Sequence, residues 1–221
     1  MHTVLEGCDT LLLDMDGTLL DLAYDNYFWQ ELLPVTYAQT HGIAHSEADA
    51  KLRALIAAQA GTLNWYCLEF WTDQLQLDIL ALKASCADRI GYLPGARAFL
   101  KYARECGYRL VLVTNSSRAL LNIKDERTQV TDLMDAVYSS GDFGAAKESQ
   151  QFWQLFSEAE DLQRERAVLL DDSASVLAAA TQFGLAGVLG LRKPDSRRAA
   201  NPLDGHHSVE TVADLLPLAA G

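Results

Sequence analysis

The sequence predicts an α/β fold, in which a doubly wound parallel sheet carries a helical domain inserted after its first strand. Two observations support this. From residue 93 onward, apolar runs alternate with segments of helical spacing, which is typical of parallel strands joined by helices. Between residues 22 and 91, apolar side chains recur at helical spacing without a convincing strand. We therefore expect an α/β core of residues 1–21 and 92–221 and a helical domain of residues 22–91 with about four helices.

The first strand is expected at Leu11–Leu13, because buried parallel strands are apolar on both faces. The run ends at Asp14, and Asp16 follows two residues later, so both carboxylates are expected at the carboxyl end of the strand. Gly17 allows the chain to turn sharply behind them. Two carboxylates this close repel each other and shift each other's pKa unless a cation joins them. An Asp-Gly turn is also a common structural feature, so this stretch alone leaves both interpretations open.

The inserted segment contains the signals of several helices. Phe28 and Leu33 lie at helical spacing, and Pro34 is expected to end or kink the first helix. Ser46 with Asp49 resembles a helix start. The remaining expected elements are a break at residues 63–65 and helices at residues 66–75 and 79–90.

The second half of the chain supplies the rest of the sheet. Gly107 and Gly184 each follow a helical segment, as expected for glycine at a helix end. Residues 193–208 are expected to form an irregular loop and residues 209–219 a terminal helix. The expected strands are residues 109–113, 136–138, 167–170 and 187–191, and the expected core helices are residues 96–106, 147–160 and 175–183.

Composition limits the classes of partner. The formal net charge is −12, which argues against nucleic-acid polymers and anionic membranes as partners but allows a small anionic ligand at a locally basic site. The sequence contains neither an apolar run long enough to span a membrane nor the pattern of a signal peptide at its start. The four cysteines form no C-x-x-C pair, so we expect reduced thiols in a cytoplasmic protein.

Polar residues follow three further predicted elements. Thr114 and Asn115 follow the second strand, at an expected helix N-terminus whose free N–H groups suit an anion. Lys147 opens the helix after the third strand, and Asp171 and Asp172 end the fourth strand. Each feature alone has an ordinary explanation as a helix cap or a surface lysine. Because the carboxyl ends of parallel strands meet at one edge of a sheet, the whole set indicates a site there.

In order and spacing, four motifs resemble those of the phosphatase branch of the haloacid dehalogenase superfamily. They are Asp14-Met15-Asp16-Gly17-Thr18, Thr114-Asn115, Lys147 and Asp171-Asp172. The helical insert resembles the type 1 cap of that superfamily, and residues 19–29, 62–67 and 193–196 resemble its bacterial GMP/IMP nucleotidases. Ser116-Ser117-Arg118 departs from the pattern, since a histidine-bearing turn is expected after the second motif.

The residue types fit hydrolysis of a phosphate monoester through a covalent aspartyl-phosphate. Asp14 is expected to be the nucleophile, because a carboxylate can attack phosphorus and divide one difficult step into two. Asp16 is expected to protonate the leaving oxygen and then to activate water. Thr114, the N–H group of Asn115 and the Lys147 ammonium are expected to hold the phosphoryl oxygens.

The resemblance also implies a Mg²⁺ cofactor. Its expected ligands are Asp14, the backbone carbonyl of Asp16 and one carboxylate of the last motif, since Mg²⁺ prefers hard oxygen donors. We favour Asp172 as the direct ligand and expect Asp171 to support the metal site without binding the metal directly. The cation would shield Asp14 from an anionic substrate in this acidic protein.

The resemblance points to a purine nucleoside monophosphate, GMP or IMP, as substrate. Asn26 and Asn64-Trp65 fall at a junction and a break of the insert, where side chains can face the sheet edge. An Asn amide can hydrogen-bond a purine edge, so we expect Asn64 or Asn26 to read the base while Trp65 packs on the ring. Most aromatic side chains of the insert are expected to form its core.

Other functions remain open at this stage. The same motifs occur in phosphatases of sugar phosphates or other small metabolites and in phosphomutases. A haloacid dehalogenase shares the nucleophile but does not need Asp16, and a receiver-type signalling domain orders its acidic residues differently along the chain. A catalytically silent binding protein is a further alternative, although every expected catalytic residue type is present. The sequence does not indicate an oligomeric state.

Overall fold

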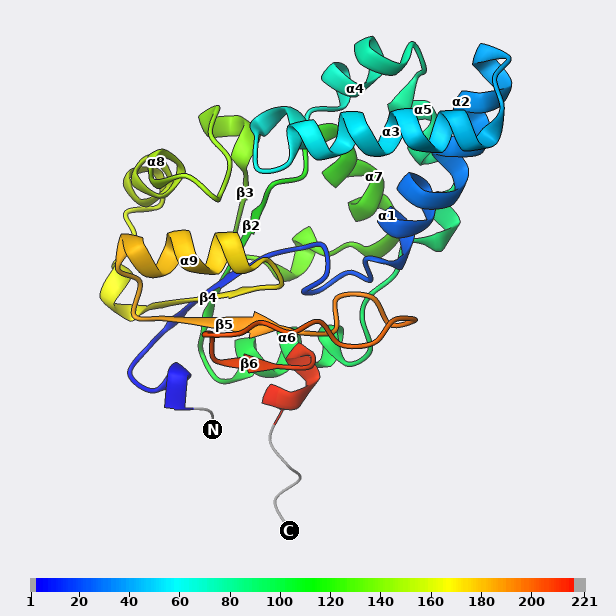
Figure 1. The fold of residues 1–221 in the computed structure, drawn as a ribbon. Coiled ribbons are helices and arrows are strands. Elements are labelled where there is room, and N and C mark those ends of the chain that lie inside the picture. The colour runs from blue at the N-terminus through cyan, green and yellow to red at the C-terminus, as the bar shows by residue number, and fades with distance from the viewer. Residues whose placement is uncertain (1–2, 217–221) are drawn as a thin grey trace.

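A computed structural model describes residues 3–216 and shows a six-stranded sheet with helices on both faces (Figure 1). The strand order is β3-β2-β1-β4-β5-β6, and every neighbouring pair is parallel. This confirms the predicted doubly wound α/β fold. The strands are β1 (Thr10–Leu13), β2 (Arg109–Thr114), β3 (Ala136–Ser139), β4 (Ala167–Asp171), β5 (Gly187–Leu191) and β6 (Ser208–Val209).

The central strands are apolar on both faces because each face packs against its own layer. In β1, Leu12 joins the cluster on one face, whereas Leu11 and Leu13 join the cluster on the other. β1 lies between β2 and β4, so its backbone groups are satisfied from both sides. The first five strands lie within one residue of their predicted limits at each end.

Two helices cover each side of this sheet core. α8 (Gln150–Glu160) and α9 (Ala174–Phe183) pack on the Leu12 face, where Phe152, Trp153 and Phe156 are fully buried. α6 (Ala96–Glu105) and α7 (Arg118–Thr128) contribute to the opposite cluster. The sheet therefore holds the ends of β1, β2 and β4 in fixed positions relative to one another.

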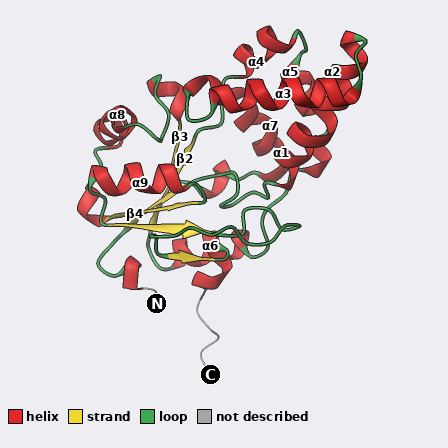
Figure 2. Ribbon diagram, viewed as in Figure 1, coloured by secondary structure: helices red, strands yellow, loops and turns green. Residues whose placement is uncertain are grey.

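The segment between β1 and α6 is helical throughout its regular parts (Figure 2). It has its own apolar cluster, in which Tyr24, Phe28 and Trp71 are buried. Leu120 of α7 joins the same cluster and attaches these helices to the core. This separate core supports the proposed division at residues 22 and 91. The helices are α1 (Ala23–Tyr27), α2 (Leu33–His41), α3 (His45–Gln59), α4 (Leu68–Leu75) and α5 (Ile79–Ala84).

Two local expectations for the helical segment are wrong in part: Pro34 was expected to end or kink the first helix, and Ser46 with Asp49 was expected to mark a helix start. Pro34 does not end the helix: it lies near the start of α2, and a π-helical turn at Phe28–Leu32 joins α1 to α2. A proline fits there because the first turn of a helix does not need its N–H group. α3 starts at His45 with Ala44 as its N-cap, and no side chain caps it, so Ser46 is not the cap. The break at residues 63–65 is a 3₁₀ turn, Leu63–Tyr66.

Two expectations near the core are also corrected. Lys147 precedes α8, whose N-cap is Ser149, so the lysine lies in the connecting turn. The predicted C-terminal helix is instead β6 followed by a 3₁₀ turn at Val212–Leu215, and its remaining part, residues 217–219, lies outside the described residues. No helix within residues 3–216 is long and apolar enough to cross a membrane.

The packing predicts a large cost for truncating a sheet residue. Leu169 of β4 is fully buried, so Leu169→Ala is expected to lower the free energy of unfolding by about 2–5 kcal/mol. Leu80 of α5 is 39% exposed, and Leu80→Ala is expected to change it by less than about 0.5 kcal/mol. Chemical denaturation of both variants checks this, and equal effects would contradict the core described here.

Candidate active site

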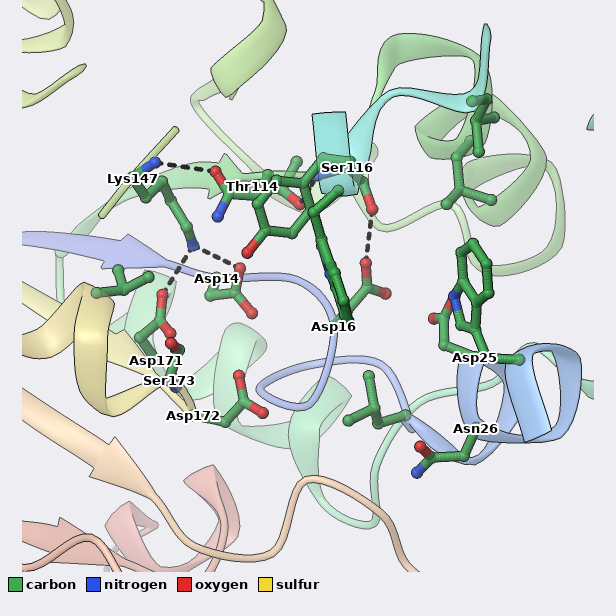
Figure 3. Close-up of a pocket in the computed structure, with 18 of the residues that line it drawn as sticks. Asp14, Asp16, Asp25, Asn26, Thr114, Ser116, Lys147, Asp171, Asp172 and Ser173 are labelled. Carbon is green, nitrogen blue, oxygen red and sulfur yellow. Dashed lines mark hydrogen bonds and ion pairs between the residues drawn. The ribbon is translucent and has the colours of Figure 1, made fainter. Parts of the chain in front are cut away.

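A cavity of about 320 Å³ opens at the carboxyl ends of β1, β2 and β4 (Figure 3). The α/β core contributes residues from all four predicted motifs, and the helical segment contributes the opposite wall. Segments far apart in the sequence therefore meet in one site. Its polar lining includes Asp14, Asp16, Thr114, Asn115, Lys147, Asp171 and Asp172 from the core, and Asp25, Asn26, Tyr66 and Lys83 from the helical segment.

Lys147 joins the carboxyl ends of β1 and β4 at the floor of this cavity. Its Nζ donates to Asp14 Oδ1 at 2.6 Å, to Asp171 Oδ2 at 2.7 Å and to the carbonyl oxygen of Val113 at 2.9 Å. The lysine is 1% exposed. Burial alone would lower the pKa of Lys147, but the two carboxylates outweigh that effect and raise it. The side chain therefore remains an ammonium ion in an enclosed site.

The turn before α8 holds this lysine in place. The indole Nε1 of Trp153 donates to the carbonyl oxygen of Lys147 at 2.7 Å, and the Lys147 N–H donates to Asn115 Oδ1 at 3.0 Å. The Asn115 amide nitrogen donates in turn to Glu148 Oε2, and the Tyr66 hydroxyl donates to Glu148 Oε1. Side chains of the second and third motifs and of the helical segment thus position one another.

Three carboxylates form a candidate metal site. Oxygen atoms of Asp14, Asp171 and Asp172 lie within 4.8 Å of one another. Burial raises the pKa of Asp14 to about 6; the Lys147 ammonium opposes this shift and the Asp171 carboxylate adds to it. Burial, together with the charges of Asp171 and Asp14, also raises the pKa of Asp172. Such mutual repulsion and an all-oxygen donor set fit a hard divalent cation such as Mg²⁺.

The two acidic residues of the last motif differ in their partners. Asp171 accepts from Lys147 through Oδ2 and from the backbone N–H of Ser173 through Oδ1. The Asp172 carboxylate has no hydrogen-bond donor among residues 3–216. Its carboxylate approaches the turn at Gly17, where φ is +85° and a Cβ atom would lie 2.7 Å from Asp172 Oδ2. Gly17 therefore provides both the left-handed turn and the space for Asp172.

The Asp16 carboxylate points away from this carboxylate group. Its Oδ1 accepts from Lys124 Nζ at 2.6 Å and its Oδ2 from the Ser116 hydroxyl at 2.8 Å. Burial raises the pKa of Asp16, although the Lys124 ammonium opposes the shift. Ser116, where a histidine-bearing turn was expected, thus contacts an expected catalytic residue.

Thr114 and Asn115 lie at the end of β2, where the motif was expected, but not at the helix N-terminus. α7 starts at Arg118, and its N-cap is Ser117. Thr114 Oγ1 accepts from the backbone N–H of Ser116 at 3.0 Å, which makes a tight turn above the sheet edge. Both side chains line the cavity.

The structure separates the three expected base-reading residues. Asn26 and Trp65 line the cavity, whereas the exposed Asn64 lies outside it and its amide donates to Gln59 Oε1. Asn26 Nδ2 donates to Asp195 Oδ2 at 2.7 Å, and its Oδ1 accepts from Gln30. Asn64 is therefore not brought to the site.

Sequence reasoning missed a cluster beside Asp16 that consists of the partly exposed Asp25 and the buried Lys83 and Lys124. Lys124 Nζ donates to Asp25 Oδ2 and Lys83 Nζ to Asp25 Oδ1, both at 2.8 Å. Lys124 follows Leu120 by one helical turn, so it lies on the buried face of α7. The sequence signal that could have revealed Lys124 is a lysine on the apolar face of a helix.

Comparisons with known proteins agree with this geometry. The family model of haloacid dehalogenase-like hydrolases matches residues 8–184. A protein of Escherichia coli (strain K12) named GMP/IMP nucleotidase YrfG is 40% identical over 212 residues, which cover 96% of each sequence.

Solved structures show the same fold. A HAD phosphatase from Thermococcus onnurineus superposes with a TM-score of 0.77 at 22% identity, covering 94% of this chain and 95% of that one. CbbY from Rhodobacter sphaeroides, in complex with phosphate, gives a TM-score of 0.68 at 18% identity, covering 96% and 98%. Fold, motif order and family match agree, and the chain belongs to the haloacid dehalogenase-like hydrolases.

Proposed function

We propose that this phosphatase is a Mg²⁺-dependent 5′-nucleotidase that hydrolyses purine monophosphates, with GMP and IMP as preferred substrates. The observation that carries the proposal is the Asp14–Lys147–Asp171 arrangement facing a cavity that also contains Asp16. The nucleotide preference rests on the 40% identity to the E. coli protein named for that activity. Four free cysteines fit the reducing cytoplasm in which we place the enzyme.

Asp14 is assigned as the nucleophile. It lies directly after β1, where the rigid strand fixes its backbone, and it lines the cavity. Attack of its carboxylate on phosphorus forms an aspartyl-phosphate while the bond to the leaving oxygen breaks. Water then attacks phosphorus, which releases inorganic phosphate and restores Asp14.

Asp16 is assigned as the general acid and base. Its proton passes to the leaving oxygen in the first step, and the resulting carboxylate takes a proton from water in the second. The raised pKa of Asp16 favours the protonated form that the first step needs.

The Lys147 ammonium, Thr114 and the N–H group of Asn115 are assigned to the phosphoryl oxygens. The arrangement is fixed before substrate arrives, because Lys147 is already held by three acceptors. Donors fixed in advance stabilise developing charge at a low cost of reorganisation. When bound by Asp14, Asp172 and the Asp16 carbonyl, Mg²⁺ would offset the negative charge of nucleophile and substrate.

Purine recognition is assigned to the helical segment. Trp65 and Asn26 line both the main cavity and a second cavity of about 740 Å³ between α1, α2 and α3. An aromatic ring there can stack on a base. The Asn26 amide oxygen accepts one hydrogen bond from Gln30 and can accept a second. GMP and IMP carry an N1–H group that can donate this second hydrogen bond, whereas AMP has no N1–H group.

The nucleophile assignment predicts the behaviour of Asp14→Asn. The change keeps the size of the side chain but removes the attacking charge, so turnover is expected to fall by more than about 10³-fold. Circular dichroism should remain that of the wild type. Phosphate release from GMP measures the effect, and substantial turnover by a pure, folded variant would contradict the covalent mechanism.

The two residues of the last motif predict different metal effects. Chelation by EDTA should abolish activity and Mg²⁺ should restore it. Asp172→Ala should raise the Mg²⁺ concentration needed for half-maximal activity more than Asp171→Ala, because Asp171 is already bound to Lys147 and Ser173. Asp171→Ala should mainly lower maximal turnover by releasing Lys147. A metal titration giving the opposite ranking would reverse the assignment.

The substrate assignment predicts a selective effect of Trp65→Ala. Loss of stacking should lower kcat/KM for GMP and IMP by about tenfold or more, and that for a small sugar phosphate far less. Asn26→Ala should reduce the preference for GMP over AMP. Asn64→Ala is the matched control and should keep the wild-type ranking. A phosphate-release screen over nucleotides and sugar phosphates measures all four proteins, and faster turnover of a sugar phosphate by the wild type would favour the metabolite phosphatase instead.

A further inference from the structure

Two buried lysines and two partly exposed aspartates form a chain that links the helical segment to Asp16. Lys83 of α5 binds Asp25 of α1, Asp25 binds Lys124 of α7, and Lys124 binds Asp16, with nitrogen–oxygen distances of 2.6–2.8 Å. Two positive and two negative groups balance one another. We call these four residues the charge chain.

Lys124 occupies a different position from the other members of the chain. Asp16, Asp25 and Lys83 line the main cavity, whereas Lys124 is not among its lining residues and is 1% exposed. Burial alone would lower the pKa of Lys124, but Asp16 and Asp25 outweigh that effect and raise it. Lys124 is therefore a buried ammonium that can affect a substrate only through its two carboxylate partners.

The two oxygens of Asp16 have distinct environments. Oδ1 accepts from Lys124, which lies behind the cavity wall, and Oδ2 accepts from the hydroxyl of Ser116, which lines the cavity. An ammonium donates only, so the oxygen that it occupies is a poor place for a proton. A hydroxyl can donate or accept, so Oδ2 can carry a proton while Ser116 reverses its role.

Asp25 fixes Lys124 from the helical side. Although burial opposes it, the ammonium groups of Lys124 and Lys83 hold the pKa of Asp25 well below its usual range. Lys83 Nζ also lies 4.3 Å from the centroid of the Phe28 ring, within the apolar cluster of the helical segment. Buried ion pairs are weak sources of stability, because desolvation offsets most of their attraction. Stability alone therefore does not account for a chain of four charged residues that ends on Asp16.

We propose that Lys124 is a positioning residue: by occupying Oδ1 of Asp16 it makes Oδ2 the oxygen that carries the exchangeable proton and aims it into the cavity. Asp25 and Lys83 hold Lys124 in place. The orientation of the Asp16 carboxyl group therefore depends on the position of the helical segment over the site. This inference rests on the proposed role of Asp16 as general acid.

The test is the dependence of kcat/KM on leaving group. A poor alkoxide leaving group such as that of GMP needs protonation, whereas para-nitrophenolate hardly does. Asp16→Asn serves as the reference and should lose about 100-fold or more with GMP and much less with para-nitrophenyl phosphate. Lys124→Met should lower the ratio of GMP to para-nitrophenyl phosphate turnover by about tenfold, and Lys124→Arg should recover most of it.

Two further variants control for folding and charge. Lys124→Met with Asp25→Asn removes one charge of each sign, so the remaining chain stays balanced, and this pair should show the same leaving-group effect if Lys124→Met alone fails to fold. Lys101 is exposed on α6, and Lys101→Met should match the wild type. Circular dichroism and thermal unfolding establish that each variant is folded.

The outcomes separate the two levels of the proposal. Equal losses on both substrates in folded Lys124→Met, or in the balanced pair, would overturn the positioning role while leaving the selective loss of Asp16→Asn, and the proposed function, intact. Absence of a selective loss in Asp16→Asn itself would overturn the acid role and the positioning role together. A selective loss in both, recovered in Lys124→Arg, is the result that we expect.

Discussion

The structure of the site depends on one buried ammonium ion between two carboxylates. Lys147 bridges Asp14 and Asp171, which end adjacent strands. Without it, the sheet edge would bring three acidic side chains together, and no other lysine or arginine among residues 3–216 forms an ion pair with them. A chain with a net charge of −12 can bind an anion there only because the local balance differs from the global one. The hydrogen bonds of Trp153 and Asn115 to the backbone of Lys147 connect this balance to the packing of α8.

A second buried lysine, Lys124 of α7, repeats the same arrangement on the other side of the cavity. Lys124 lies between Asp16 and Asp25 as Lys147 lies between Asp14 and Asp171. The two expected catalytic carboxylates are thus held by separate buried ammonium ions: Lys147, from the turn before α8, and Lys124, from α7, which also binds Asp25 of the helical segment. Such separation suits two groups with opposite tasks, because each keeps its own electrostatic environment. In the proposed mechanism the helical segment therefore contributes to the chemistry as well as to the walls of the cavity.

The sequence predicted the fold and the sheet-edge motifs because both follow local rules. Apolar runs such as Leu11–Leu13 mark buried parallel strands, and their carboxyl ends meet by topology. β6 was missed because two residues carry no periodic signal, and Pro34 does not end the helix because a π-helical turn leads into α2, where the proline lies in the first turn. The Lys124–Asp16 pair joins residues 108 positions apart, which no local pattern shows. Asn64 has a suitable residue type, but the direction of its side chain depends on the orientation of the 3₁₀ turn Leu63–Tyr66, which the sequence does not show.

The most direct test of the account is to trap the phosphorylated enzyme. Enzyme turning over phosphate-labelled GMP in the presence of Mg²⁺ is quenched in acid within one turnover, digested, and its peptides are analysed by mass spectrometry. We predict a phosphoryl group on Asp14, in the peptide that contains Asp14 and Asp16, and none on the Asp14→Asn variant. Turnover without any phosphorylated peptide, or with the group on another residue, would contradict the assignment of Asp14 as the nucleophile.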